Sequence, residues 1–378
     1  MNLQSRSTHR RNQRFAMAGV FALLGMTLVR PGAAAASPVS PTPTPAVRVA
    51  PPEWRLATME HVDLWLHGFA LLTSDTGHVP FFDRGYKQQV TALKRQKNIY
   101  SSLDANLADL QKGIVANPSL AANGQFIAMY FASFQEIVNA TDFFFRSSGN
   151  PRAARDPQIA QEIAILASTF RTQSDRNWLR LFVQSLQDEN NRFFHAYWTS
   201  EQQTRGAAFS AVSEAWASRF YPKLARFLNN TQQGSGQLVL SIPLGGEGRT
   251  INDGKKSNLI AVEYPKTTEA ANEAVFAFVH EAVAQLAQEA INDNTTPAEQ
   301  RSGAATEYTG NGAVRGGAVL IQRLFPDLVP EYMRYYLRAL GRPVPTGDPT
   351  AAFGQAFPLP AAILDALTRQ IDVVLGGI

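Results

Sequence analysis

The residue pair His280-Glu281 has the spacing best suited to specific chemistry in this sequence. In the pattern H-E-x-x-H on a helix, two histidines four residues apart lie on one face and can bind the same Zn²⁺ ion. The glutamate between them can then act as general base on the metal-bound water. Ala284 occupies the second histidine position, so the chain retains one ligand and the base and lacks the other ligand.

The surroundings of this pair favour a defined site. Apolar residues at 275, 276, 278 and 279 precede the pair and predict a buried helix. A pair of strand-like segments comes immediately before that helix. Two acidic residues, Glu299 and Glu307, follow at the distance expected for a third metal ligand on a later helix. Glu299 also fits another role, because Thr296-Pro297-Ala298-Glu299 is the pattern of a capped helix start.

Residues 237 to about 325 resemble the core of the gluzincin metallopeptidases, which has a small sheet, a helix bearing HExxH and a later helix bearing a glutamate ligand. In that family the histidines and the later glutamate bind zinc, and the motif glutamate is the base. The resemblance implies that Glu281 is catalytic and that His280 and Glu307 bind metal, with Glu299 as the alternative to Glu307. The region is also similar to a group of uncharacterised exported bacterial proteins with an HE-containing helix followed by T-T-P-A-E.

A role without metal is the alternative for His280. Catalytic zinc normally has three protein ligands and a water, and two ligands would hold it loosely. A buried helix histidine can instead be satisfied by a nearby acid such as Glu307. Elsewhere, Asp63 and His67 are four residues apart on an expected helix, where we predict a local pair rather than shared ligation. His195 lies among aromatic residues and is predicted to be a packed histidine.

Residues 1–36 have the composition of a signal peptide. Four arginines between positions 6 and 14 precede an apolar run of fifteen residues, Phe15 to Val29, which is too short to span a membrane. The four alanines at 33–36 supply the small residues of a cleavage site. We therefore expect export to the bacterial periplasm or the extracellular space, with no stable membrane insertion after cleavage.

The charge of the chain depends on that segment. The whole sequence has 35 basic and 31 acidic residues, but five of the arginines lie in residues 1–37, where there is no acid. The mature chain is therefore close to neutral, which argues against nucleic acid as a partner. The chain has no cysteine, which excludes disulfides and thiolate metal ligands. A peptide or protein partner stays open.

The helical and strand-like patterns along the sequence predict a mainly α protein with a small antiparallel β-sheet, which belongs to the α+β class. We expect a gluzincin-like core in the C-terminal half. A Pro-rich linker, residues 37–53, leads to a helical N-terminal region, residues 54–230. Residues 231–378 supply strands at 237–244 and 259–264, the HE helix and the C-terminal helices. Residues 126–145 are apolar almost all round and predict one central buried helix. Gly310 is expected to end or bend a helix, and Gly316-Gly317 indicates close helix packing.

The sequence therefore predicts an exported metallopeptidase-like protein with an incomplete HExxH motif, either non-catalytic or with an atypical metal site. One alternative is a non-enzymatic helical binding or scaffold protein of the cell envelope. The other is an active zinc peptidase with an unidentified third ligand. We expect no cofactor, and zinc is the metal that the alternative would require.

Overall fold

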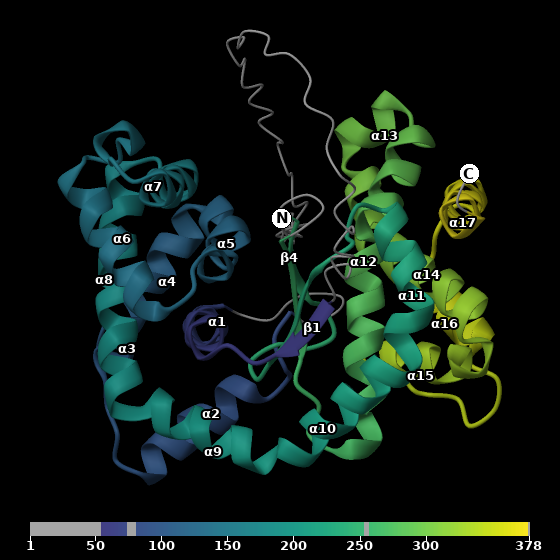
Figure 1. Ribbon diagram of the computed structural model, residues 1–378, viewed down its shortest axis with the longest axis horizontal. Coiled ribbons are helices and arrows are strands. Elements are labelled where there is room, and N and C mark those ends of the chain that lie inside the picture. The colour runs from purple at the N-terminus through teal and green to yellow at the C-terminus, as the bar shows by residue number, and fades with distance from the viewer. Residues whose placement is uncertain (1–53, 74–80, 253–256, 377–378) are drawn as a thin grey trace, which may run out of the picture.

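The computed structural model describes residues 54–73, 81–252 and 257–376, which form a mainly helical protein with a small central sheet (Figure 1). The mainly α, α+β class predicted from the sequence is confirmed at this level. The predicted signal peptide and linker, residues 1–53, lie outside the described residues. Within the described ranges, no helix combines the length and apolarity needed to cross a bilayer.

The sheet has four strands in the order β1-β2-β4-β3. Their bounds are β1 Trp54–Ala57, β2 Gly236–Ser241, β3 Arg249–Ile251 and β4 Asn258–Glu263. β1, β2 and β4 run parallel, and β3 alone is antiparallel. The predicted antiparallel sheet is therefore wrong for the two strands recognised in the sequence. The reason is that β3 carries the chain back along the outer edge, so that β4 starts at the same end as β2 and pairs with it in parallel.

Helices surround this sheet on both sides. Those between β1 and β2 are α1 Glu60–Leu72, α2 Tyr86–Gln96, α3 Ser102–Ala105, α4 Leu107–Ala116, α5 Pro118–Gly124, α6 Phe134–Arg146, α7 Pro157–Thr169, α8 Gln173–Glu189, α9 His195–Thr204, α10 Gly206–Ala215 and α11 Tyr221–Asn230. Those after β4 are α12 Ala271–Asp293, α13 Pro297–Ser302, α14 Ala304–Leu324, α15 Val329–Ala339, α16 Thr350–Ala356 and α17 Ala361–Gly376. Figure 1 shows α12 between the sheet and the pair α14 and α17.

Two helix predictions fail for identifiable reasons. Residues 126–145 do not form one buried helix, because Phe131 is extended and Ser133 starts a new helix, α6, by accepting a hydrogen bond from the Glu136 amide at 3.1 Å. Only one side of α6 is buried. Gly310 does not end its helix, since α14 continues through it to Leu324, and the alternative that it bends the helix stays a prediction. The capped start at Thr296 is confirmed, with Glu299 completing the capping box.

Two π-helical turns join neighbouring α-helices. Residues Asn190–Phe194 connect α8 to α9, and Trp216–Phe220 connect α10 to α11. Such turns insert an extra residue and rotate the side chains that follow, and they are frequent at functional sites. The first turn brings Asn190 and His195 beside α1, as described below.

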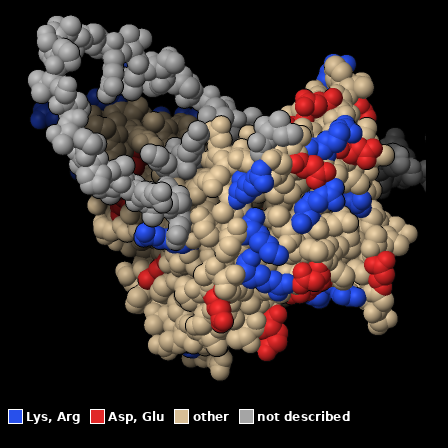
Figure 2. All heavy atoms as spheres, turned by 45° about the vertical axis from the view of Figure 1, so that its right-hand side comes forward, with Lys and Arg blue, Asp and Glu red and all other residues tan. Residues whose placement is uncertain are grey.

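Basic side chains on α11 and the turn before it attach this segment to the C-terminal helices. Arg219 pairs with Asp327, Lys223 donates to the carbonyl of Leu324 at 3.2 Å, and Arg226 donates to the carbonyl of Gly376. The last two carbonyls lie at helix C-termini, where positive charge is favourable. Figure 2 shows one face of the molecule on which lysine and arginine side chains form a column with aspartate and glutamate side chains beside it.

Candidate functional site

Helix α12 holds His280 and Glu281 in its buried middle. Its residues from Ala274 to Val279 are wholly buried against the sheet and neighbouring helices. His280 is 5% exposed and its imidazole lies 5.8 Å from the ring of Tyr336 on α15, measured between ring centroids. The structure therefore confirms a buried helix at this position and places the pair inside the molecule.

The carboxylate of Glu281 accepts hydrogen bonds from three protein donors. The backbone amide of Gly248 donates to Oε1 at 3.1 Å, and the hydroxyl of Thr250 donates to Oε2 at 2.6 Å. The Nδ1 atom of His280 lies 3.0 Å from Oε1. A Cβ atom at position 248 would lie 2.6 Å from Cγ of Glu281, so only glycine allows the strand to come this close.

Arg249 lies on the opposite side of strand β3 from Thr250, as strand alternation requires. Arg249 is 1% exposed. Its guanidinium donates to Gln125 Oε1 at 2.8 Å and to the carbonyl of Gly248 at 2.6 Å, and lies 4.2 Å from the ring centre of Phe81. Burial lowers the pKa of Arg249 to about 10, against the opposing charges of Glu247 and Glu281. Arg249 thus contacts Gln125 and Phe81 on one side of β3, while Thr250 on the other side donates to Glu281 of α12.

The pair of α12 is stabilised in its charged form. Burial disfavours the charge on His280, but the hydrogen bond and charge of Glu281 outweigh it and raise the histidine pKa. Burial likewise disfavours the charge on Glu281, and His280, with help from Thr250 and Arg249, lowers the glutamate pKa. The two residues therefore form a buried, mutually supporting ion pair.

The two candidate third ligands lie elsewhere. A Cβ atom at Gly312 of α14 would lie 3.4 Å from Cβ of Ala287, and one at Gly316 would lie 3.4 Å from Cγ2 of Val283. The two helices therefore run antiparallel, and Glu307, which precedes Gly312, lies toward the C-terminal end of α12 and away from His280. Glu307 is exposed there.

Glu299 is occupied in the capping box of α13, where its carboxylate accepts from the Thr296 amide at 2.8 Å. The structure thus brings together His280 and Glu281 alone of the predicted site residues. Across residues 54–73, 81–252 and 257–376, no group of three histidine or carboxylate side chains is arranged to hold a metal ion. Val283 and Ala287, the residues of α12 on either side of position 284, approach Gly316 and Gly312 of α14, which offer no side chain. The metal assignment to His280 and Glu307 stays a prediction.

A second buried polar centre was not predicted. Nε2 of His67 on α1 lies 3.1 Å from Glu189, its Nδ1 lies 2.8 Å from the hydroxyl of Tyr86, and Lys94 donates to Glu189 at 2.6 Å. Burial opposes the charge on Glu189, but His67 and then Lys94 overcome it and lower the glutamate pKa to about 2. No local sequence pattern identifies this group, because Glu189 is 122 residues from His67.

Asp63 does not pair with His67, contrary to the prediction. Its Oδ2 accepts from Trp198 Nε1 at 2.9 Å and from the amide of Ile242, just past the end of β2, at 3.4 Å. Asp63 is wholly buried, and burial raises its pKa to about 7 despite these bonds. The carboxyl group therefore lies at the junction of α1, α9 and the sheet.

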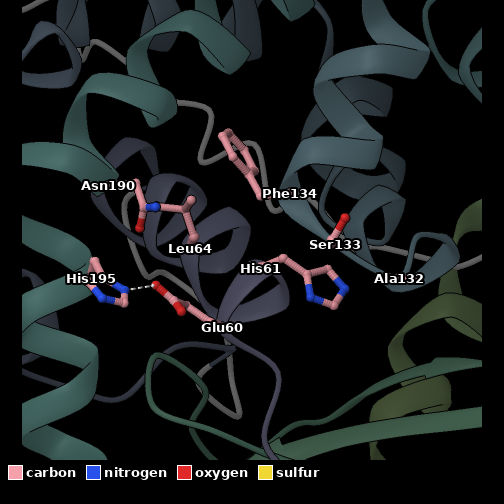
Figure 3. A pocket seen from close by; sticks show the side chains of 8 residues that line it. All are labelled: Glu60, His61, Leu64, Ala132, Ser133, Phe134, Asn190 and His195. Carbon is pink, nitrogen blue, oxygen red and sulfur yellow. Dashed lines mark hydrogen bonds and ion pairs between the residues drawn. The ribbon is translucent and has the colours of Figure 1, made fainter.

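His195 is not the packed histidine that its aromatic neighbours predicted. The π-helical turn before it rotates its side chain outward, and it is 66% exposed with Nδ1 2.7 Å from Glu60. It lines a pocket of about 260 Å³ together with His61 and Asn190 (Figure 3). This pocket is separate from the pair on α12.

No protein-family model, curated protein or solved structure matches this chain. The gluzincin resemblance of residues 237–325 therefore rests on the sequence pattern and stays a prediction.

Proposed function

We propose that this chain is an exported, metallopeptidase-like protein that does not catalyse hydrolysis at its HE pair and acts by binding a partner. The observation that carries the proposal is that both oxygens of the Glu281 carboxylate are engaged by protein donors, Oε1 by Gly248 and His280 and Oε2 by Thr250. A general base needs a lone pair directed at the proton that it removes. Here the carboxylate is directed into strand β3, and the pair fastens that edge strand to α12.

The helix opposite supports the same proposal. In the zinc arrangement a second histidine would stand at Ala284 and a glutamate on the later helix. At the corresponding level α14 presents Gly312 and Gly316, and these glycines let the two helix backbones approach closely. The space between the helices is therefore used for packing.

An active zinc peptidase is the second candidate, and one observation favours it. Nε2 of His280 is buried and makes no hydrogen bond to any described residue, so it could bind a metal if the imidazole lost the proton that its pair with Glu281 favours. Zinc content tests both proposals. We expect the purified mature protein to carry well under one zinc per chain after incubation with excess Zn²⁺ and gel filtration.

His280→Ala removes the predicted metal ligand, and His195→Ala is its control, because His195 lies outside α12. Stoichiometric zinc that disappears in His280→Ala and persists in His195→Ala would overturn the non-catalytic proposal. Ala284→His adds a further comparison, because it restores the second ligand position of the motif. Zinc binding gained only in this variant would support an altered metal site that lacks only the histidine at position 284.

A further inference from the structure

Three carboxyl groups gather at the carboxyl end of strand β4. Glu263 is the last residue of that strand, Asp83 precedes α2, and Glu273 lies in the first turn of α12. Lys266 pairs with Asp83 at 2.7 Å, and Arg338 of α15 pairs with Glu273. The side chain of Glu263 forms no hydrogen bond or ion pair with any described residue, although the charges of Asp83 and Glu273 act on it. Glu263 is therefore the acid of this cluster without a partner.

Glu263 changes charge near neutral pH. Burial is the main cause that raises its pKa, and the charges of Asp83 and Glu273 add to it, so that the pKa reaches about 7 although Lys266 acts in the opposite direction. Tyr335 of α15 faces two of the same acids, and burial together with their charges raises its pKa well above the ordinary value, which keeps it neutral. Glu263 thus carries a proton below about pH 7 and a negative charge above it.

The two cations whose charges act on Glu263 differ in their freedom to move. Arg205 is buried, bonds to the carboxylate of Glu201 through two nitrogens and donates to the carbonyl of Tyr264 at 2.6 Å. The side chain of Lys266 is 53% exposed, and Asp83 is its one partner among the described residues. Lys266 is therefore the cation that can turn toward an ionised Glu263, which lies three residues before it in the chain.

The ion pair of Lys266 holds one wall of a second pocket. Its partner Asp83 belongs to the segment 81–83, which lies on the loop after β2, where the Asp83 amide donates to the carbonyl of Pro243 at 2.9 Å. The chain continues into residues 82–88, which together with the end of α1 line a pocket of about 330 Å³. The pair thus ties the wall formed by residues 82–88 to the chain that follows β4.

We propose that the Lys266–Asp83 pair is a pH-sensitive latch: when Glu263 loses its proton, Lys266 turns from Asp83 to Glu263, and the pocket wall formed by residues 82–88 loosens. The ionised Glu263 also repels Asp83, which favours the same movement. The latch is closed below about pH 7, where the neutral Glu263 does not compete for Lys266, and it opens as the pH rises through that value. The hydrogen-bond partners of the HE pair lie outside this group, so the latch is independent of it.

Amide hydrogen exchange followed by mass spectrometry on the mature protein can test the latch. Peptides that cover residues 82–88 are compared at pH 6 and pH 8 after correction for intrinsic exchange rates. In wild type the protection should fall roughly threefold to fivefold at the higher pH, which is the size expected for an exposed ion pair. Glu263→Gln cannot ionise and should keep the same protection at both pH values. Glu214→Gln, at an exposed position of α10, should behave as wild type.

Lys266→Ala tests the cation of the latch. Because the side chain is largely exposed, the variant should fold, and its protection at pH 6 should already be as low as that of wild type at pH 8. Equal wild-type protection at the two pH values, or unchanged protection in Lys266→Ala, would overturn the proposal. A pH dependence that persists in Glu263→Gln would also overturn it, by assigning the effect to another group such as Asp63. None of these results changes the outcome of the zinc experiment.

Discussion

At the scale of single residues, Glu281 of α12 accepts three hydrogen bonds through its side chain. Its side chain is 11% exposed and joins one backbone amide, one hydroxyl and one imidazole. Removing one member of a buried charged group leaves its partners without hydrogen bonds, which costs more than the net value of the bonds themselves. The HE pair should therefore matter for stability even though we assign it no catalytic step.

We predict that Glu281→Ala lowers the free energy of unfolding by about 3–5 kcal/mol, because it leaves the His280 imidazole, the Thr250 hydroxyl and the Gly248 amide without their shared buried acceptor. Thr250→Val removes one hydrogen bond and should cost about 1–2 kcal/mol. Glu289→Ala, at an exposed position of the same helix, should stay within about 0.5 kcal/mol of wild type. Urea denaturation followed by circular dichroism measures all three. A loss below about 1 kcal/mol for Glu281→Ala would contradict the structural role.

Asp63 should make stability depend on pH. Its pKa is raised from 3.8 to about 7 in the folded state, so between these values the unfolded chain has lost a proton that the folded chain keeps. Folding stability contributed by this residue is therefore present below pH 4 and is lost as pH rises to about 7. Asp63→Asn retains an oxygen for Trp198 and removes this titration.

Relative to wild type, Asp63→Asn should gain stability between pH 4 and pH 8, by at most about 4 kcal/mol. Denaturant unfolding of both proteins at the two pH values gives the difference. Other groups with shifted pKa values, such as Glu263, are common to both proteins and cancel. A stability difference that is the same at both pH values would show that Asp63 is ionised in the folded protein at pH 4.

At the scale of helices and strands, the C-terminal helices pack through glycines. A Cβ atom at Gly316 would lie 2.9 Å from Leu367 Cδ2 on α17, and one at Gly317 would overlap the hydroxyl of Tyr332. That hydroxyl is fixed by its hydrogen bond to the carbonyl of Val314 at 2.9 Å, so it cannot move aside without losing the bond. The close packing that Gly316-Gly317 predicted is thus present, with α12, α15 and α17 as the partners.

Gly317→Ala should destabilise the protein by about 1–3 kcal/mol, because it overpacks a fixed contact. Gly206→Ala is the matched control, since Gly206 is also helical but has no atom within 4 Å of the added Cβ. There alanine should be neutral or stabilise by up to about 1 kcal/mol through helix propensity. Thermal unfolding of the two variants beside wild type provides the measurement. Equal effects at the two positions would exclude the packing explanation.

At the scale of the whole molecule, the first strand connects the two predicted regions. Trp54 in β1 donates to the carbonyl of Gln233 at 2.6 Å, its own carbonyl accepts from Trp216 at 3.1 Å, and its ring lies 5.0 Å from that of Phe278 on α12. A residue from the start of the predicted helical region therefore packs against the HE helix. The division into residues 54–230 and 231–378 stays a prediction.

We predict that Trp54→Ala destabilises the whole protein by about 3–5 kcal/mol, because it removes a large buried side chain and two anchored contacts. Tyr100→Ala, at a residue that is 67% exposed, should have little effect. Unfolding monitored by near-ultraviolet and far-ultraviolet circular dichroism should give one coincident transition in the variant. Two separated transitions would show instead that the two regions unfold independently.

The sequence by itself determined the features that depend on neighbouring residues. Apolar spacing predicted the buried helix around His280, and the order Thr296-Pro297-Ala298-Glu299 predicted a helix start, because caps and amphipathic faces are set by residues within one or two turns. It identified two strands by their branched apolar residues. Their parallel direction was not available, since it depends on the short edge strand β3 between them.

Only the tertiary structure decided which side chains meet. Glu281 bonds to Gly248 and Thr250 across more than 30 residues, and His67 bonds to Glu189 across 122. The π-helical turn at Asn190 directed His195 outward to Glu60, against its aromatic surroundings. Long-range pairing depends on how the whole chain packs, and local residue patterns do not encode it. The role of the HE pair thus follows from its hydrogen-bond partners on β3, which its motif alone could not supply.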